Sequence, residues 1–463
     1  MLSKFVQSCL ANRLFFFETI LTWVICALVV LLFASLGRPI WIDEFLHFAF
    51  AAFGTTLEAW SAIKQSTISV NHGQTGIYML VNYWLLKLFG AEILVLRAPS
   101  LISAFLLCYF AALFVKMRGY GFAWQIFSIF TMCCQAELMY FSGEARPYMP
   151  LAAAAVGVLL YYLASSTQRE LTAVKMVGWF SVLFGVLMHP YFSIYWLALV
   201  CYGLWVSWLN KEITLTPRGV MSYLNIPLCV VGAVIYFALA SQTWLAGSPA
   251  FDRDPFHFMP RSELPHLLIW HHTTFLGPVQ GGEILMLSCL VVQIIFIFLP
   301  KKIKHYFRLI LPPIVLIFTA LGLTLALSFL SYHQNYWILT RQWVASIALV
   351  AVGFVWLCAA VVSIVLKALP IAVRQNGHFA ALVLIVFGCW QLNEETLRAR
   401  WRESVTAVTM SAASINIDPP KQVQCPISPD TWVELANKNL KANTSVWPIF
   451  KFYYSSGNPY CVD

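Results

Sequence analysis

Asp43 and Glu44 form an acidic pair that directly follows the first long apolar segment of the chain. A carboxylate there could act as a general base, if it lies within hydrogen-bond reach of an acceptor hydroxyl. Alternatively, both acids fill the first turn of a helix, where negative charge suits the helix dipole. His47 follows Asp43 by four residues and shares its helical face, so it could orient the carboxylate, bind phosphate, or simply pack at an interface.

A second cluster of ionisable residues lies in the short polar segment 140–148, where Glu144, Arg146 and Tyr148 alternate with small residues and Pro147. Glu144 and Arg146 could pair with each other at an interface. The alternative is a second acid that faces a site, beside a guanidinium whose planar fork matches a phosphate group. Tyr148 is a candidate for the wall of that site.

Further candidates come from three other polar segments. Arg341 lies between aromatic residues before an apolar run, where it either snorkels to an interface or binds a phosphate. His72 precedes Gly73 in a polar segment that could line the mouth of a site. Arg253, between two aspartates, and His271, before a second histidine, are weaker candidates because such pairs are common in loops.

The sequence has no Walker A, GxGxxG, paired CxxC or HExxH motif. Nucleotide hydrolysis and a zinc-protease active site are therefore unsupported. No metal ligand set is predicted and no cofactor is required, although the acidic pair could recruit a divalent cation.

These side chains must be positioned by membrane helices. The chain has 463 residues, of which 60% are hydrophobic and 11% are charged, and its mean hydropathy is +0.74. Soluble domains carry about 25% charged residues, so the composition indicates an integral membrane protein. The net charge of +9 is ordinary for such a protein and gives no support to nucleic-acid binding.

Apolar runs and charge distribution predict an all-α, multi-pass architecture. We expect the first run to be an uncleaved span. Basic residues concentrate in alternate short loops, which places the N-terminus in the cytoplasm and the C-terminal tail outside. The eleven predicted spans are 15–36, 98–115, 121–139, 149–165, 173–189, 191–209, 220–241, 284–300, 309–330, 343–366 and 379–393.

The outer face then gathers the candidate residues. The first outer loop, 37–97, is predicted to contain two amphipathic helices, 43–64 and 76–89. The second is too short to span, since a crossing helix needs about 20 apolar residues. Residues 140–148 form the second outer loop and 243–283 a longer one. Residues 1–393 form the membrane module, and 394–463 a small outer tail in which Cys425 and Cys461 could pair in an oxidising compartment.

The order of these motifs resembles the GT-C superfamily of glycosyltransferases that use polyprenyl-phosphate sugars. The motifs are an acid after the first span, a flat helix led by His72, the run Leu96–Ser100, a basic inner loop, and the run Glu144–Tyr148. They cover about residues 15–200, with a looser match around Arg341. The nearest likeness is to bacterial lipid A aminoarabinose transferases and protein O-mannosyltransferases, although these often continue the histidine with Pro-Pro-Leu and this chain has Gly73-Gln74-Thr75.

The resemblance implies an enzyme of the bacterial inner membrane that moves a sugar to a hydroxyl on its periplasmic side. The acceptor could be lipopolysaccharide, another cell-envelope glycan, a glycolipid or a protein. Asp43 would match the catalytic base and Glu144 the second acid, while Arg146, Arg341 and His72 would hold the donor phosphate. Glu44, His47, Tyr148, Arg253 and His271 would line the site. Direct displacement with inversion at the sugar is expected.

Two rival functions use a similar composition. A lipid-linked glycan transporter or flippase would need ionisable residues deep in the spans and commonly shows internal repeats, neither of which is evident. A glycan polymerase or ligase would rely more on basic outer-loop residues than on an acid in the first loop, so Asp43 argues mildly against it.

Overall fold

A computed structural model provides the fold. It describes residues 2–34, 44, 47, 50–51, 53–65, 75–90, 92–169, 171–213, 216–245, 304–333, 343–367, 383, 423–424 and 461–462. Within these ranges the chain is almost entirely helical. The long helices are α1 (Leu2–Phe33), α5 (Ile93–Met117), α6 (Phe122–Cys133), α8 (Tyr148–Leu163), α10 (Thr172–Met188), α11 (Phe192–Leu209), α13 (Ile226–Leu245), α16 (Lys304–His333) and α17 (Val344–Lys367).

Four helical segments are long and apolar enough to cross a membrane, judged by length and composition: α5, α11, Arg308–Leu327 within α16, and α17. Helices occupy nine of the eleven predicted spans. The predicted spans 284–300 and 379–393 lie outside the described ranges, apart from residue 383. A helical membrane protein fits these helices, and the number of crossings remains a prediction.

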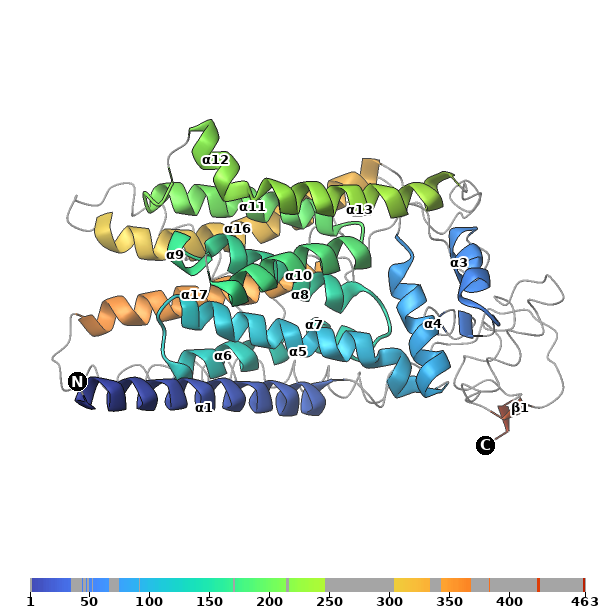
Figure 1. The fold of residues 1–463 in the computed structure, drawn as a ribbon, viewed down its shortest axis with the longest axis horizontal. Coiled ribbons are helices and arrows are strands. Elements are labelled where there is room, and N and C mark those ends of the chain that lie inside the picture. Colours follow the sequence, from blue (N-terminus) through green and yellow to red (C-terminus); the bar gives the residue numbers. More distant parts are fainter. Residues whose placement is uncertain are drawn as a thin grey trace.

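The long helices run back and forth along one axis, so the bundle has two distinct ends (Figure 1). At one end, called here the α4 end, lie the short helices α3 (Thr56–Lys64) and α4 (Ile77–Phe89), near the beginning of α5. At the other, the α9 end, lie α9 (Ser166–Arg169) and α12 (Pro217–Leu224). The start of α1 lies at the α9 end (Figure 1). This alternation is what the predicted register requires.

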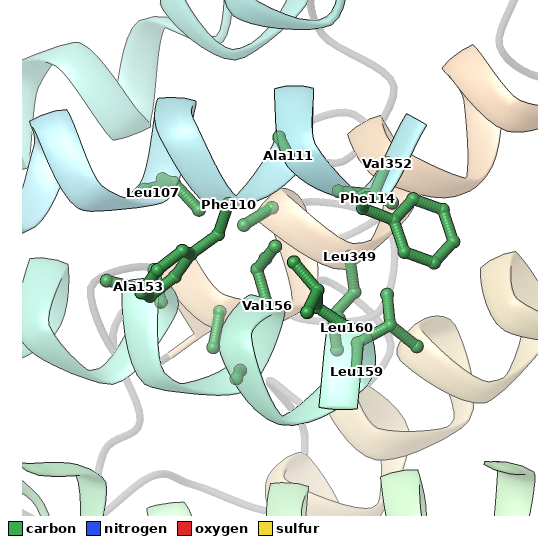
Figure 2. Packing of buried hydrophobic residues seen from close by; sticks show 14 of the residues in the cluster. Leu107, Phe110, Ala111, Phe114, Ala153, Val156, Leu159, Leu160, Leu349 and Val352 are labelled. Atoms are coloured by element: carbon green, nitrogen blue, oxygen red, sulfur yellow. The ribbon is translucent and has the colours of Figure 1, made fainter. Parts of the chain in front are cut away.

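Helix α8 is the centre of the bundle, and every one of its residues is buried. A helix that is apolar on all sides needs neighbours all round. Figure 2 shows α5 and α17 packed on it, with Phe110 and Phe114 of α5 among Val156 and Leu160 of α8 and Leu349 of α17. The small residues Ala152–Ala155 allow this close approach, as is common between helices in membranes.

The first predicted amphipathic helix, 43–64, is wrong as a single element. Residues 53–55 are not helical, and α3 begins at Thr56. Thr55 caps α3 by accepting a hydrogen bond from the Glu58 backbone N–H, and the Glu58 carboxylate accepts one from the Thr55 N–H. This capping box, preceded by Gly54, favours a new helix start at that position over continuation. The second amphipathic helix, predicted at 76–89, is confirmed as α4.

The predicted span 121–139 is also divided. Helix α6 ends at Cys133, Gln135 is extended, and α7 (Ala136–Ser142) follows. No glycine or proline marks this break, so the local sequence could not predict it.

In the tail, a short strand β1 (Val423–Gln424) pairs in parallel with β2 (Cys461–Val462). The register sets Cys461 opposite Val423, which brings together the two segments of the predicted disulfide. Cys425 lies outside the described residues, so the disulfide stays a prediction.

Candidate active site at the α4 end of the bundle

A buried ion pair joins the first outer loop to α5. Arg97 Nε donates to Glu44 Oε1 at 2.9 Å and Arg97 Nη2 donates to Oε2 at 3.0 Å, so the two planar groups meet in a fork. Both residues are fully buried. Charges so far from water are tolerated only when paired and hydrogen-bonded, and this geometry supplies both.

The same carboxylate also holds the second outer loop. The Ala145 backbone N–H donates to Glu44 Oε1 at 2.8 Å. Ala145 is flanked by the candidate residues Glu144 and Arg146, in a turn where the Arg146 N–H donates to the Glu144 carbonyl at 2.8 Å. Glu44 therefore fixes the backbone between the two candidates, and Glu144 itself is 2% exposed.

Arg146 lies beside two aromatic rings from different helices. Its guanidinium carbon is 5.7 Å from the centroid of the Tyr148 ring, and its Nη2 donates a long hydrogen bond of 3.4 Å to the Tyr148 hydroxyl. The ring of His189, at the end of α10, lies 5.7 Å from that of Tyr148. These contacts place a cation, a phenol and an imidazole side by side.

His189 is held as a neutral imidazole. The Tyr191 N–H donates to its Nδ1 at 3.1 Å, which leaves the ring proton on Nε2. Burial, with a smaller contribution from Arg146, lowers the pKa of His189 to about 3. At neutral pH this ring can therefore donate a hydrogen bond without adding charge.

Helix α4 contacts the site through hydrogen bonds to α5 and to the end of α10. The Tyr78 hydroxyl lies 3.1 Å from Ser100 Oγ, which donates to the Arg146 carbonyl at 3.1 Å. Burial raises the pKa of Tyr78, so this phenol stays protonated. Before α4, the Thr75 hydroxyl donates to the Leu187 carbonyl, and this bond anchors the beginning of α4 to the end of α10.

Of the three roles considered for His47, the structure shows packing against a neighbouring element. His47 is 1% exposed, its Nδ1 accepts a hydrogen bond from Asn82 Nδ2 at 2.7 Å, and its ring meets the Tyr78 ring edge to face. These contacts tie the first outer loop to α4.

Half of the predicted site residues lie in this cluster. The structure brings Glu44, Glu144, Arg146 and Tyr148 together through the contacts above, with His47 bound to α4 beside them. Asp43, His72, Arg253, His271 and Arg341 lie outside the described residues, so their predicted roles stay predictions.

Two contributors were missed by sequence reasoning. Arg97 entered only as part of the run Leu96–Ser100 and was given no role in the site, although a cation four residues inside an apolar helix is a signal for a buried partner. His189 ends the apolar run of α10, and nothing in its neighbourhood distinguishes it from an interfacial histidine. Its partners come from α8 and from residues 144–146, which only the fold brings near.

The arrangement combines a buried acid, a guanidinium and a neutral imidazole donor. A guanidinium and an N–H donor suit an oxyanion or phosphate, and an acid suits proton transfer. Within the described ranges, no group of three or more His, Cys, Asp or Glu side chains could hold a metal ion.

Comparison with known proteins adds no identification: no family model matches the chain, and neither a curated protein nor a solved structure matches it.

Proposed function

We propose that the protein is a multi-pass membrane glycosyltransferase of GT-C-like architecture that uses a polyprenyl-phosphate sugar. One observation carries the proposal: Glu44, paired with Arg97, accepts a hydrogen bond from the Ala145 N–H and so fixes the backbone between Glu144 and Arg146. The Arg146 guanidinium in turn lies against Tyr148, whose ring meets that of His189. An acid and a guanidinium are thus held at one end of an apolar bundle. A lipid-linked sugar would present its phosphate at that level.

In the proposed reaction, a carboxylate removes the proton of an acceptor hydroxyl as its oxygen attacks the anomeric carbon. The bond from that carbon to the phosphate oxygen breaks, and the phosphate leaves with the electron pair. Attack opposite the leaving group inverts the anomeric centre. Asp43 is the proposed base, because its neighbour Glu44 already accepts three hydrogen bonds and cannot readily approach an acceptor.

The leaving phosphate gains negative charge in the transition state, so donors aimed at it lower the barrier. Arg146 is the proposed principal cation, supported by Arg341 and His72. Glu144 is the proposed second acid, able to hold an acceptor or sugar hydroxyl. The proposal places the enzyme in a bacterial inner membrane, with this site facing the periplasm and a glycan, glycolipid or protein as acceptor.

The test is a transfer assay with purified protein in detergent and defined polyprenyl-phosphate sugars. Asp43→Asn keeps the side-chain shape but removes the base, and we expect a loss of at least about 10²-fold in rate. Glu144→Gln and Arg146→Gln should each reduce transfer. Glu92→Gln is the matched control, since Glu92 is exposed near the same end of the bundle.

Full transfer by Asp43→Asn at matched protein levels would exclude Asp43 as the base. No transfer by the wild type with any donor, together with movement of a lipid-linked glycan across vesicles, would instead favour a transporter. The anomeric configuration of the product, measured by NMR, tests inversion separately.

A further inference from the structure

A second cationic cluster lies toward the α9 end, far along the bundle from the candidate active site. Arg118 caps the C-terminus of α5, and its guanidinium carbon lies 4.4 Å from the centroid of the Trp356 ring. Trp356 lies eleven residues before the end of α17 at Lys367, which is about 16 Å along the helix. In Figure 1, α1, α16 and α17 extend beyond the ends of α5 and α6 on this side. Arg118 is therefore recessed from the end of α17.

The recessed guanidinium has hydrogen-bond donors without acceptors. In the part of the chain that the structure describes, Arg118 Nε and Nη2 are both buried and neither donates a hydrogen bond. Burial lowers the pKa of Arg118, although the phenol of Tyr202 and the carboxylate of Glu212 oppose this effect. A buried cation with unused donors is costly, and basic pockets at the ends of membrane helices commonly bind anionic groups.

A second guanidinium reaches the same neighbourhood from α9. Arg169 lies with its guanidinium carbon 4.3 Å from the centroid of the Tyr223 ring, and its buried Nε also lacks an acceptor among the described residues. Tyr223 lies within electrostatic range of both arginines and of Glu212. Glu212, the carboxylate that acts electrostatically on Arg118 and Tyr223, is exposed.

The described groups around the two arginines do not supply the missing acceptors. The Tyr202 hydroxyl donates to the Pro312 carbonyl at 2.7 Å, and the Tyr223 hydroxyl donates to the Tyr162 carbonyl at 2.7 Å. Lys116, two residues before Arg118, forms an ion pair with Glu18 at 3.2 Å. The contrast is informative, because Lys116 has a carboxylate partner, whereas no carboxylate among the described residues forms an ion pair with Arg118.

We infer that Arg118 and Arg169 form a binding site for a phosphate group, distinct from the candidate active site at the α4 end. A phosphate offers several acceptor oxygens to two guanidinium forks, which is the geometry that arginine suits best. The group belongs either to the headgroup of an anionic phospholipid or to a free phosphate. Basic pockets between membrane helices bind lipid headgroups in this manner.

The test compares thermal unfolding of the full chain in nanodiscs of phosphatidylcholine with that in nanodiscs containing phosphatidylglycerol. A second arm adds inorganic phosphate or chloride, at equal ionic strength, to the phosphatidylcholine nanodiscs. Native mass spectrometry counts the phosphatidylglycerol molecules retained by the protein. The variants are Arg118→Gln, Arg169→Gln and the charge-preserving Arg118→Lys, with Lys175→Gln as control because Lys175 is an exposed cation on the adjacent α10.

We expect phosphatidylglycerol to raise the unfolding temperature of the wild type and of Lys175→Gln. Arg118→Gln and Arg169→Gln should lose most of this rise and about tenfold in lipid affinity. Arg118→Lys should fall between them, because it keeps the charge and loses the fork. Stabilisation by inorganic phosphate alone, with the same variant pattern, would identify a free phosphate as the ligand.

Equal responses of the wild type and both glutamine variants to each anion would overturn the inference. If Arg118→Gln does not fold, Arg169→Gln decides the result, since Arg169 lies in the short helix α9 and not at the end of a long helix of the bundle.

Discussion

At the scale of single residues, two adjacent acids have separate roles in the proposal. Glu44 accepts two hydrogen bonds from Arg97 and one from the Ala145 N–H. Its charge therefore organises the cluster, and the proposed chemistry falls to Asp43 and Glu144. Sequence alone marked the acidic pair as important but assigned Glu44 only to the lining of the site, because its partner Arg97 lies 53 positions further along the chain.

The first prediction concerns the stability of this ion pair. Glu44→Gln leaves Arg97 buried without its carboxylate, and we expect a loss of about 3–5 kcal/mol in the free energy of unfolding. Lys116→Gln breaks the more exposed pair with Glu18 and should cost less than about 1 kcal/mol. Urea or thermal unfolding in one detergent measures both. Similar losses in the two variants would contradict a structural role for Glu44.

The second prediction concerns the pH dependence contributed by His189. Its pKa in the folded state is about 3, below the usual value of 6.5, so between these limits the unfolded chain binds the extra proton. Stability should therefore fall as the pH drops below about 6.5, by at most about 1.4 kcal/mol per pH unit from this residue.

His189→Gln cannot take up that proton, so its stability should depend less steeply on pH between 6.5 and 4 than that of the wild type. Unfolding midpoints at several pH values give the difference. Parallel curves for the two proteins would show that His189 titrates normally.

At the scale of helices, the runs of apolar residues predicted where most helices lie, but not where these helices are interrupted. The break at 53–55 carries a signal, Gly54 followed by the Thr55–Glu58 capping box, which a search for apolar runs passes over. The break between α6 and α7 carries no such signal. There the bundle, with α5, α8 and α17 packed around α7, decides where the chain turns.

The third prediction tests the close packing of α8 on α10. A Cβ at Gly157 would lie 2.9 Å from Ser181 Cβ and 3.1 Å from a ring carbon of Phe110, so the helices would have to move apart. We expect Gly157→Ala to destabilise the protein by about 1–3 kcal/mol.

Gly322→Ala is the matched control, since Gly322 also lies within a helix but a Cβ there would meet nothing within 4 Å. It should be neutral or slightly stabilising, because alanine favours the helix. Thermal unfolding compares the two. A neutral Gly157→Ala would mean that Ser181 and Phe110 can yield without cost.

At the scale of the whole molecule, the sequence could predict at which end of the bundle each loop lies, but not which residues meet there. Alternating basic loops assigned Glu144, Arg146 and the first outer loop to one end, and the described helices alternate in that register (Figure 1). That Glu44 would reach Arg97 and Ala145 depends on how α4, α5 and α10 pack laterally. The spans are apolar on most sides, so the sequence shows no hydrophobic stripe that would indicate which helices are neighbours.

The last prediction tests the orientation of the molecule in its membrane. Glu92 lies at the α4 end and Glu212 beyond the end of α11 at the α9 end, and both are exposed. If the α4 end faces outward, a membrane-impermeant maleimide should label Glu92→Cys in intact spheroplasts and Glu212→Cys only after permeabilisation. The unmodified chain gives the background of its own cysteines. Labelling of both variants from the same side would mean that the helices between them do not cross the membrane as proposed. Labelling of Glu212→Cys alone from outside would reverse the orientation and move the proposed transfer reaction to the cytoplasmic face.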